Sequence, residues 1–323
     1  MENPYIFITR KLSEHIIRPL REKFQVEMWM EEDQPVPRDI LMNEAKRADA
    51  LITMLSDKID EELLNVSQSL KVVANLAVGF DNIDIKAASD KGIVVCNTPD
   101  VLTDTTADLT FALLMATARR ISEAVDLVKS GGWKSWSPLL MAGHDVHHKT
   151  IGIVGMGSIG EAVAKRAKGF DMEILYYNRN RKLRAEEQLG AKYCEFQDLI
   201  ETSDFIVCLT PLTEETFHLF DLKAFQSMKR TAIFINAARG PVVKEGDLYE
   251  ALIDKEIAAA GLDVFEVEPI GADHPLLCMD NVVALPHIGS SSTETRETMM
   301  KLCAENVERV LTGKEPRTKV TSS

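Results

Sequence analysis

The stretch that decides the fold is Gly155-Met156-Gly157-Ser158-Ile159-Gly160, near the middle of the 323-residue chain. An apolar run at 150–154 precedes it and predicts a buried strand, and residues 161–167 predict a helix. In that order, the first glycine permits a tight turn, the second lets the backbone approach a pyrophosphate, and the third lets helix and strand pack closely. The phosphates would lie at the helix N-terminus, where N–H groups and the helix dipole favour negative charge. A packing turn is the alternative, but the flanking elements favour nucleotide binding.

Strand and helix patterns alternate on both sides of this stretch. Before it, strands are predicted at 5–9, 26–29, 50–54, 72–74 and 93–96, and helices at 13–23, 38–47, 61–66, 84–91 and 104–120. After it, further strands are predicted at 173–177, 205–209, 232–236, 259–263 and 282–284, and a last helix at 292–311. This alternation predicts an α/β fold of two Rossmann-like, doubly wound parallel-sheet domains with a cleft between them. The last helix has no sheet of its own and is expected to cover the first domain, and the polar tail after Gly313 is expected to fray.

Composition narrows the class of partner. The net charge is −13 and no block of lysine and arginine stands out, so a nucleic-acid surface is not expected. An anionic small molecule would then need a local positive site. No apolar stretch at the N-terminus is long enough for a signal peptide or membrane helix, and we expect a soluble, cytoplasmic protein without a membrane partner.

Two other residue types are expected to carry no chemistry. The five cysteines are scattered without a CxxC spacing, which favours free, mostly buried thiols in a reducing compartment. His144, His147 and His148 crowd together, but no cysteine or carboxylate set completes a ligand shell, so no metal is expected.

The end of the second strand after the glycine stretch bears on the choice of cofactor. An NAD site usually has a carboxylate there, which accepts hydrogen bonds from the ribose. This chain has Asn178 and Arg179 instead, with Arg181 close behind. Because an arginine can pair with the additional phosphate of NADP, NADP(H) is the preferred cofactor, with NAD as the alternative. A solvated basic loop would give the same sequence.

Three polar residues follow later strands and are candidates for proton transfer. Arg239 follows the strand at 232–236, Glu268 lies beyond the strand at 259–263, and His287 follows the strand at 282–284. An arginine can grip a carboxylate, and a carboxylate partner favours the protonated form of a histidine, which can then act as an acid. Each residue alone could equally be structural.

Together, these segments resemble the D-isomer-specific 2-hydroxyacid dehydrogenases. The resemblance runs from about Leu55 to Gly289 and comprises the glycine stretch, the segments 236–240 and 261–269, and 286–289 in the family's order. Segments 55–57, 75–81 and 132–136 are most similar to the glyoxylate/hydroxypyruvate reductases. The resemblance implies a discontinuous, flavodoxin-like substrate-binding domain at 1–100 and 290–323, and an NAD(P)-binding Rossmann domain at 101–289.

It also implies the chemistry of the site. Hydride transfer from NADPH would reduce glyoxylate to glycolate or hydroxypyruvate to D-glycerate. Arg239 would bind the substrate carboxylate and polarise the keto oxygen, His287 would donate the proton, and Glu268 would keep His287 charged and oriented. Leu55 and the backbone amides of Val78 and Gly79 would bind the substrate from the first domain. The residues expected to contact the cofactor are Gly155, Met156, Gly157, Ser158, Ile159, Gly160, Asn178, Arg179, Arg181, Thr106, Thr210, Pro211, Ala237, Asp263 and Gly289.

A homodimer through the cofactor domains is a further implication, and Trp133 and Trp136 are candidate interface residues. One departure concerns the substrate: Leu140 stands where the animal-type reductases carry a tryptophan that reaches the neighbouring subunit's substrate. A 2-ketogluconate reductase or another D-2-hydroxyacid dehydrogenase therefore remains an alternative. A phosphoglycerate dehydrogenase is less favoured because no regulatory domain follows residue 311. The alternative from another class is a nicotinamide-sensing binding protein without catalysis.

Overall fold

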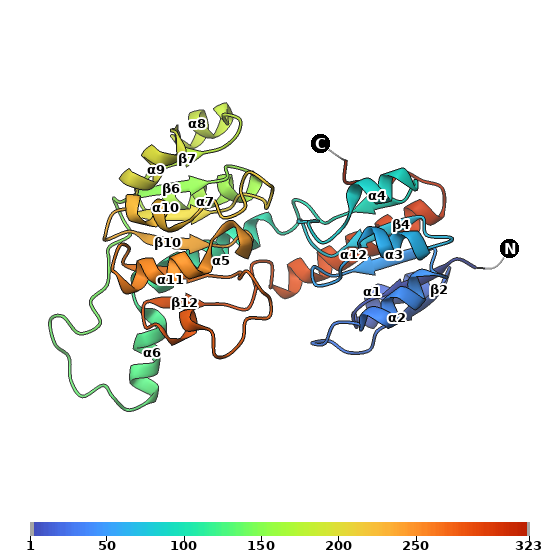
Figure 1. The fold of residues 1–323 in the computed structure, drawn as a ribbon, viewed down its shortest axis with the longest axis horizontal. Coiled ribbons are helices and arrows are strands. Elements are labelled where there is room, and N and C mark those ends of the chain that lie inside the picture. The colour runs from blue at the N-terminus through green and yellow to red at the C-terminus, as the bar shows by residue number, and fades with distance from the viewer. Residues whose placement is uncertain (1–2, 322–323) are drawn as a thin grey trace. The chain divides into compact units, whose positions relative to one another are not determined.

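The computed structural model describes residues 3–321 and divides into two compact units. Unit 1 consists of residues 1–102 and 292–323, and unit 2 of residues 103–291 (Figure 1). The sequence put the two joins at 100/101 and 289/290. Residues 1, 2, 322 and 323, which the expected domain limits include, lie outside the described residues.

Unit 1 is built on a parallel sheet that has five strands in the described residues, in the order β2-β1-β3-β4-β5. This is the flavodoxin-like strand order. The strands are β1 Tyr5–Ile8, β2 Gln25–Met28, β3 Ala50–Thr53, β4 Val72–Asn75 and β5 Val94–Cys96. The helices are α1 Glu14–Arg21, α2 Arg38–Ala45, α3 Glu61–Val66, α4 Ile85–Asp90 and α12 Thr293–Leu311. The central strands β1, β3 and β4 are wholly buried and apolar except for Thr53 and Asn75 at the ends of β3 and β4, whereas the edge strand β2 alternates buried and exposed residues.

Unit 2 contains, within the same described range, a seven-stranded parallel sheet in the order β12-β11-β10-β9-β6-β7-β8. Read from β8, this is the Rossmann order 3-2-1-4-5-6 with β12 added at the edge. The strands are β6 Thr150–Val154, β7 Glu173–Tyr177, β8 Lys192–Tyr193, β9 Phe205–Cys208, β10 Ile233–Asn236, β11 Ala259–Leu262 and β12 Val282–Ala284. The helices are α5 Thr103–Ala118, α6 Ile121–Lys129, α7 Ser158–Lys168, α8 Leu183–Leu189, α9 Phe196–Thr202, α10 Leu222–Ser227 and α11 Glu245–Ile253, with short 3₁₀ turns at Gly240–Val242 and Pro275–Cys278. The predicted α/β class with two parallel sheets is confirmed.

The core of unit 2 lies on both faces of its sheet. One apolar cluster joins Leu113 of α5 and Val163 of α7 to β6, and the other joins Leu199 of α9 and Leu248 of α11 to β9 and β10. Figure 1 shows the corresponding helices flanking the strands. Burial on both faces explains why these strands appear in the sequence as continuous apolar runs. It also leaves only the strand ends for polar, functional side chains.

The structure differs from the sequence-based expectation at three places. The helix expected to run to residue 120 stops at Ala118, because Arg120 adopts a left-handed backbone (φ 53°) and α6 begins at Ile121. The two-residue strand β8 was not predicted from the sequence. The tail after Gly313 was expected to fray, which is wrong: Lys319 forms an antiparallel bridge with Cys96 of β5.

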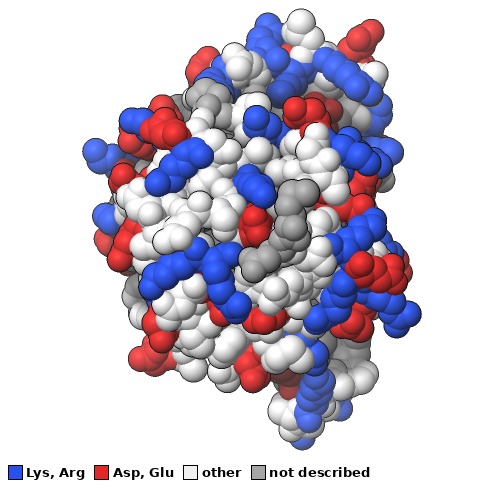
Figure 2. All heavy atoms as spheres, turned by 90° about the vertical axis from the view of Figure 1, so that its right-hand side faces the viewer, with Lys and Arg blue, Asp and Glu red and all other residues white. Residues whose placement is uncertain are grey.

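Charges of both signs are interspersed on the face of the molecule drawn in Figure 2. Among the described residues, many charged side chains form ion pairs, such as Lys23 with Glu308 and Lys71 with Asp49. Exposed pairs of this kind contribute only about 0–1 kcal/mol each to stability.

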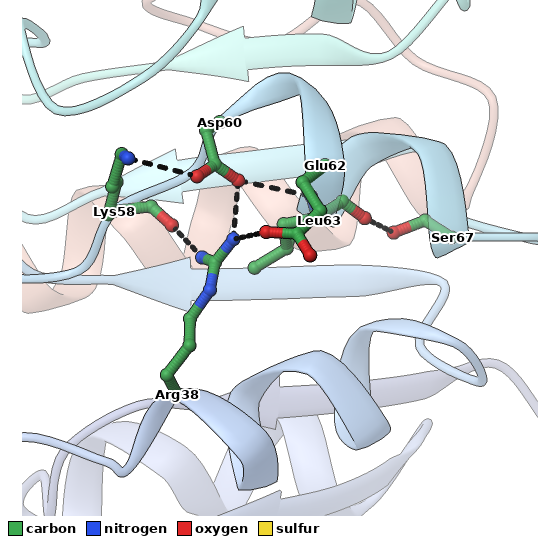
Figure 3. Close-up of polar contacts among 6 residues, drawn as sticks. All are labelled: Arg38, Lys58, Asp60, Glu62, Leu63 and Ser67. Carbon is green, nitrogen blue, oxygen red and sulfur yellow. Dashed lines mark hydrogen bonds and ion pairs between the residues drawn. The ribbon is translucent and has the colours of Figure 1, made fainter.

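A denser polar network fixes the segment that leads into α3 (Figure 3). The Asp60 carboxylate accepts the backbone N–H of Leu63 at 3.1 Å and so caps the helix. The same carboxylate pairs with Arg38 of α2 and with Lys58, and the Arg38 guanidinium also donates to the Lys58 carbonyl at 2.6 Å. Partial burial would raise the pKa of Asp60, but the bonds from Arg38, Leu63 and Lys58 lower it below its ordinary value.

This network predicts a pH-dependent contribution to stability. Because the folded-state pKa of Asp60 is lowered, its contribution is present above the unfolded value of about 3.9 and is lost as the pH falls through the folded value. Asp60→Ala should lower the free energy of unfolding by about 1 kcal/mol at pH 7. Asp60→Asn should keep most of the cap but lose the pH dependence. Urea unfolding at pH 7 and in acid tests both, and an Asp60→Ala variant as stable as the parent at pH 7 would contradict this account.

Candidate active site

The expected site residues of unit 2 follow the carboxyl ends of its parallel strands, which meet at one edge of the sheet. Gly155 follows β6, and Thr210 lies just beyond β9, the neighbouring strand on the other side of the point where the strand order reverses. Arg239, Asp263 and His287 come after β10, β11 and β12. In open α/β sheets, ligands bind at this edge and near this reversal point.

The glycine stretch has the shape that a dinucleotide requires. Gly155 has φ 105°, and a Cβ there would lie 2.6 Å from the Thr210 nitrogen, so the turn fits tightly against the end of β9. A Cβ on Gly160 would lie 2.3 Å from the Gly155 carbonyl oxygen. Gly157, by contrast, caps α7 and has no protein atom within 4 Å of the position of a Cβ. The space that a side chain would fill is therefore open in front of the helix N-terminus, where a phosphate would lie.

The other residues of this stretch contribute in different ways. Met156 is fully buried in the core, so only its backbone can face a cofactor. Ser158 is exposed and Ile159 packs partly against the core. The first N–H groups of α7, which begins at Ser158, have no partner within the helix and can donate to an anion.

The loop after β7 carries Arg179 and Arg181, which the sequence analysis grouped as cofactor contacts but which have different surroundings in the structure. Arg181 makes a two-point pair with Glu186 of α8, at 3.0 and 2.6 Å, and Glu186 also accepts the Tyr176 hydroxyl at 2.6 Å. Arg179 is exposed and lies near Glu215, whose pKa is lowered by Thr213 first and by Arg179 to a lesser degree. Arg181 therefore holds the loop to α8, while Arg179 is presented to solvent.

Another group of expected cofactor contacts is brought together around Asp263. The Asp263 side chain is buried, and its Oδ1 atom accepts the backbone N–H of Ile288 at 2.8 Å. A Cβ on Gly289 would lie 3.2 Å from Asp263 Oδ2 and 3.3 Å from the Thr106 methyl carbon. Burial raises the pKa of Asp263, and the N–H bonds from Ile288 and Gly289 oppose that rise. The buried Asp263 side chain thus fixes the turn at residues 287–289.

The strongest chemical feature of the site is a histidine–carboxylate pair. His287 Nδ1 lies 2.7 Å from Glu268 Oε2, and both side chains are partly exposed. The other Glu268 oxygen accepts the Phe265 N–H at 3.0 Å. Burial would raise the pKa of Glu268, but His287, Phe265 and Arg239 together lower it, so the carboxylate stays ionised beside the imidazole.

His287 also has an unusual backbone. Its φ of 52° lies in the left-handed region, which costs a residue with a Cβ roughly 1–3 kcal/mol. The bond from Ile288 to Asp263 and the bond to Glu268 hold the residue in this conformation. Strain of this kind persists where the surroundings determine the conformation, as they do at functional sites.

Arg239 is positioned by a turn that depends on two residues the sequence reasoning did not single out. The buried Asn236 side chain donates to the Arg239 carbonyl at 3.0 Å and accepts the Ala238 N–H at 3.1 Å. At Gly240, a Cβ would lie only 1.8 Å from the Phe265 carbonyl. The Arg239 turn can therefore lie against the loop that carries Glu268. The sequence did contain a signal for Asn236: an amide at the end of a buried apolar strand needs hydrogen-bond partners, which indicates a structural role.

The expected substrate residues of the first domain lie in unit 1, at the carboxyl edge of its own sheet. Leu55 follows β3, and Val78 and Gly79 follow β4. Within residues 3–321 no group of three or more histidine, cysteine or acidic side chains could hold a metal ion. Over the same range no helix has the length and apolar character that a membrane span requires.

Comparisons with known proteins identify the family of the chain. The family model described as "D-isomer specific 2-hydroxyacid dehydrogenase, NAD binding domain" matches residues 111–289. The glyoxylate reductase of Pyrococcus horikoshii is 50% identical over 321 residues, which cover 98% of this chain and 96% of that protein. A solved protein from Thermus thermophilus has a TM-score of 0.92 at 40% identity and covers 98% of this chain and 100% of its own.

A second solved relative is an NADPH-dependent glyoxylate/hydroxypyruvate reductase from Sinorhizobium meliloti in complex with NADP and malonate. It has a TM-score of 0.85 at 31% identity and covers 99% of this chain and 97% of its own. The chain belongs to the D-isomer specific 2-hydroxyacid dehydrogenases, an oxidoreductase family with an NAD-binding domain.

The open space at Gly157 predicts a selective effect of a single methyl group. Gly157→Ala should leave the melting temperature of the cofactor-free protein unchanged, because the new Cβ meets no protein atom. It should raise the dissociation constant of the nicotinamide cofactor, NADH or NADPH, about tenfold, or about 1.4 kcal/mol, by intruding on the phosphates. Gly246→Ala in α11 is the matched control, since its Cβ is equally unobstructed. Unchanged cofactor binding in Gly157→Ala, measured by fluorescence titration, would contradict the phosphate assignment.

Proposed function

We propose that this protein reduces glyoxylate, and hydroxypyruvate as a second substrate, with NADPH as the preferred reductant. The observation that carries the proposal is the His287–Glu268 pair at 2.7 Å beside Arg239. The many similar proteins named glyoxylate reductase support the choice of substrate.

The cofactor would supply a hydride to the keto carbon. Because His287 Nδ1 faces Glu268, the other ring nitrogen, Nε2, is the one left to donate a proton to the keto oxygen. The Glu268 carboxylate contacts Nδ1 and so holds the ring with Nε2 free to face the substrate. Arg239 would bind the substrate carboxylate in a charge-assisted pair and draw electron density from the keto oxygen. One hydride and one proton convert the keto acid into the hydroxy acid.

Unit 1 would supply the remaining substrate contacts through Leu55 and the amides of Val78 and Gly79. The chain's negative charge gives no long-range attraction for a keto acid, so these local contacts matter. Leu140 is 41% exposed and stands where the animal-type reductases carry a larger tryptophan. A larger keto acid could use the space that the tryptophan would fill, so 2-ketogluconate is the alternative substrate.

The proton-donor assignment predicts how two variants differ. His287→Asn should lower kcat on the order of 10²- to 10⁴-fold, the usual contribution of a general acid, and leave NADPH affinity within about twofold. Glu268→Gln should lower kcat less, because a glutamine side chain can still contact Nδ1 and hold the ring, but without a charge to strengthen that bond. His147→Asn, at an exposed position, is the control.

Steady-state rates from pH 5 to 9 provide the measurement. A His287→Asn enzyme that keeps a tenth or more of the parent turnover would rule out His287 as the donor. An inactive parent enzyme that still bound NADPH would instead favour a nicotinamide-sensing binding protein.

The preference for NADPH is proposed from the loop after β7, where Asn178 stands in place of a carboxylate and Arg179 is exposed. The similar Sinorhizobium meliloti enzyme, solved with NADP, supports it. Arg179→Asp should lower kcat/KM for NADPH at least tenfold and leave that for NADH unchanged or higher, because the new charge repels the 2′-phosphate. Arg184→Asp, on the exposed side of α8, is the matched control. If the parent enzyme prefers NADH, this reading of the loop is wrong.

We also propose a homodimer through α6 and the arm that follows it, defined as residues 130–140. In the described chain, α6 has no buried residue, and Val128, Trp133, Trp136 and Leu139 are 56–82% exposed. Figure 1 shows α6 and this arm standing away from the body of unit 2. Apolar surface of this extent favours an interface.

Light scattering coupled to size-exclusion chromatography tests the dimer. The parent should have twice the 36.0 kDa mass of the chain. Val128→Ser combined with Trp136→Ser should shift the mass toward the monomer, because apolar area is removed from the interface. Leu183→Ser, an exposed leucine on α8, should not. A monomeric parent would exclude the proposal.

A further inference from the structure

Three successive peptide carbonyls in unit 1, those of Ala77, Val78 and Gly79, are each held by a donor from the end of the sheet. The donors and distances are the Thr98 N–H at 2.8 Å, the Asn97 side-chain amide at 2.8 Å and the Asn75 side-chain amide at 2.9 Å. Ladder bonds of the sheet do not account for these contacts, since residues 77–79 lie beyond β4.

Fixing these carbonyls also fixes the N–H groups of the same peptide units. In a trans peptide the N–H points away from the C=O, so the N–H groups of Val78, Gly79 and Phe80 are turned to the opposite side. Within residues 3–321 none of these three N–H groups donates a hydrogen bond. Successive N–H groups presented on one side of a turn form a concave site for an anion.

The Asn75 side chain is locked from several directions. It is fully buried, and its Oδ1 atom accepts the Thr53 hydroxyl at 3.0 Å, which turns Nδ2 toward the Gly79 carbonyl. The Asn82 side chain contacts Asn75 at 3.1 Å and donates to the carbonyls of Met54 and Asp57. The loop after β3, which carries Leu55, and the loop after β4 are thereby tied together.

Asn97 is locked from the C-terminal segment of the chain. Its carbonyl accepts the Thr318 hydroxyl at 2.7 Å, and its N–H donates to the Thr318 carbonyl at 3.3 Å. Asn306 of α12 donates in turn to the Thr318 hydroxyl at 2.7 Å. The tail and the last helix therefore fix the residue that orients the Val78 carbonyl.

We propose that Asn75 and Asn97 are positioning residues that aim the three N–H groups of residues 78–80 at the carboxylate of the 2-keto acid. The proposal rests on the proposed function, in which Val78 and Gly79 bind that carboxylate. Donors held in place before the substrate arrives need no reorganisation when it binds. When the side-chain amide of Asn75 or Asn97 is removed, the carbonyl it held can rotate to bond water. The N–H group of the same peptide unit then rotates away from the substrate.

Asn97→Ala is the decisive variant, because its side chain is only half-buried and a water molecule can occupy the vacated space. It should raise KM for glyoxylate, and the inhibition constant of oxamate, about tenfold, while kcat stays within about threefold and NADPH affinity is unchanged. Asn75→Asp, which keeps the acceptor but loses the donor, should do the same. Asn281→Ala is the control, since its amide donates to the Ala258 carbonyl at 3.0 Å in unit 2.

Failure of the positioning proposal can be distinguished from failure of the proposed function. If the parent does not reduce glyoxylate, the function fails, and oxamate binding to the NADPH complex by calorimetry still tests the two asparagines. If Asn97→Ala keeps the parent's KM and oxamate affinity, or loses kcat with KM unchanged, the positioning proposal is overturned while the function stands. The melting temperatures of all variants distinguish a variant that has lost its fold from one in which only the N–H groups of residues 78–80 are misoriented.

Discussion

The hydrogen bond between His287 and Glu268 joins loops that follow different strands of one sheet, and the proposed proton transfer depends on it. It forms because the loop carrying Glu268 is held against the Arg239 turn, where Gly240 leaves no room for a side chain. On the other side, Asp263 bonds the turn after His287 and keeps the histidine in a left-handed backbone. A packing constraint at Gly240 and the buried Asp263 carboxylate thus determine where the proposed proton donor lies.

The two units apply the same physical principle. In each, parallel strands are buried on both faces, so polar side chains concentrate in the loops after the carboxyl ends of the strands. In unit 2 these loops carry the side chains that we propose act on a substrate. In unit 1, Asn75 and Asn97 act on the backbone and turn peptide N–H groups outward. Backbone donors are well suited to a carboxylate because they are fixed in direction and carry no net charge that must be desolvated.

Much of the fold and of the site in unit 2 could be predicted from the sequence, because both depend on local patterns. Apolar runs identified the strands, and Arg239 and His287 follow two of them directly. The two asparagines of unit 1 carry the same local signal as Asn236, an amide at the end of an apolar strand, but that signal does not reveal which groups they bond. Their role depends on the register of β4 against β5 and on Thr318, more than 200 residues away from Asn97.

The tail shows the same limit. Its polar composition predicted fraying, whereas Asn306 and the edge of β5 provide bonding partners that composition does not reveal. Arg181 was grouped with Arg179 by proximity in sequence, but Glu186 on the next helix holds it. Local sequence identifies which residues could act, and long-range packing decides which of them are available.

The central claim is that glyoxylate is reduced by a hydride from the nicotinamide ring. The most direct test follows a deuterium label from the cofactor to the product. Parent enzyme is incubated with glyoxylate and NADPH that carries deuterium at the transferable position of the nicotinamide ring, and the glycolate is analysed by mass spectrometry. The account predicts one deuterium on the carbon of each glycolate molecule, and none on carbon when the solvent is D₂O and the cofactor is unlabelled. Glycolate without deuterium from the cofactor, or no glycolate at all, would contradict it.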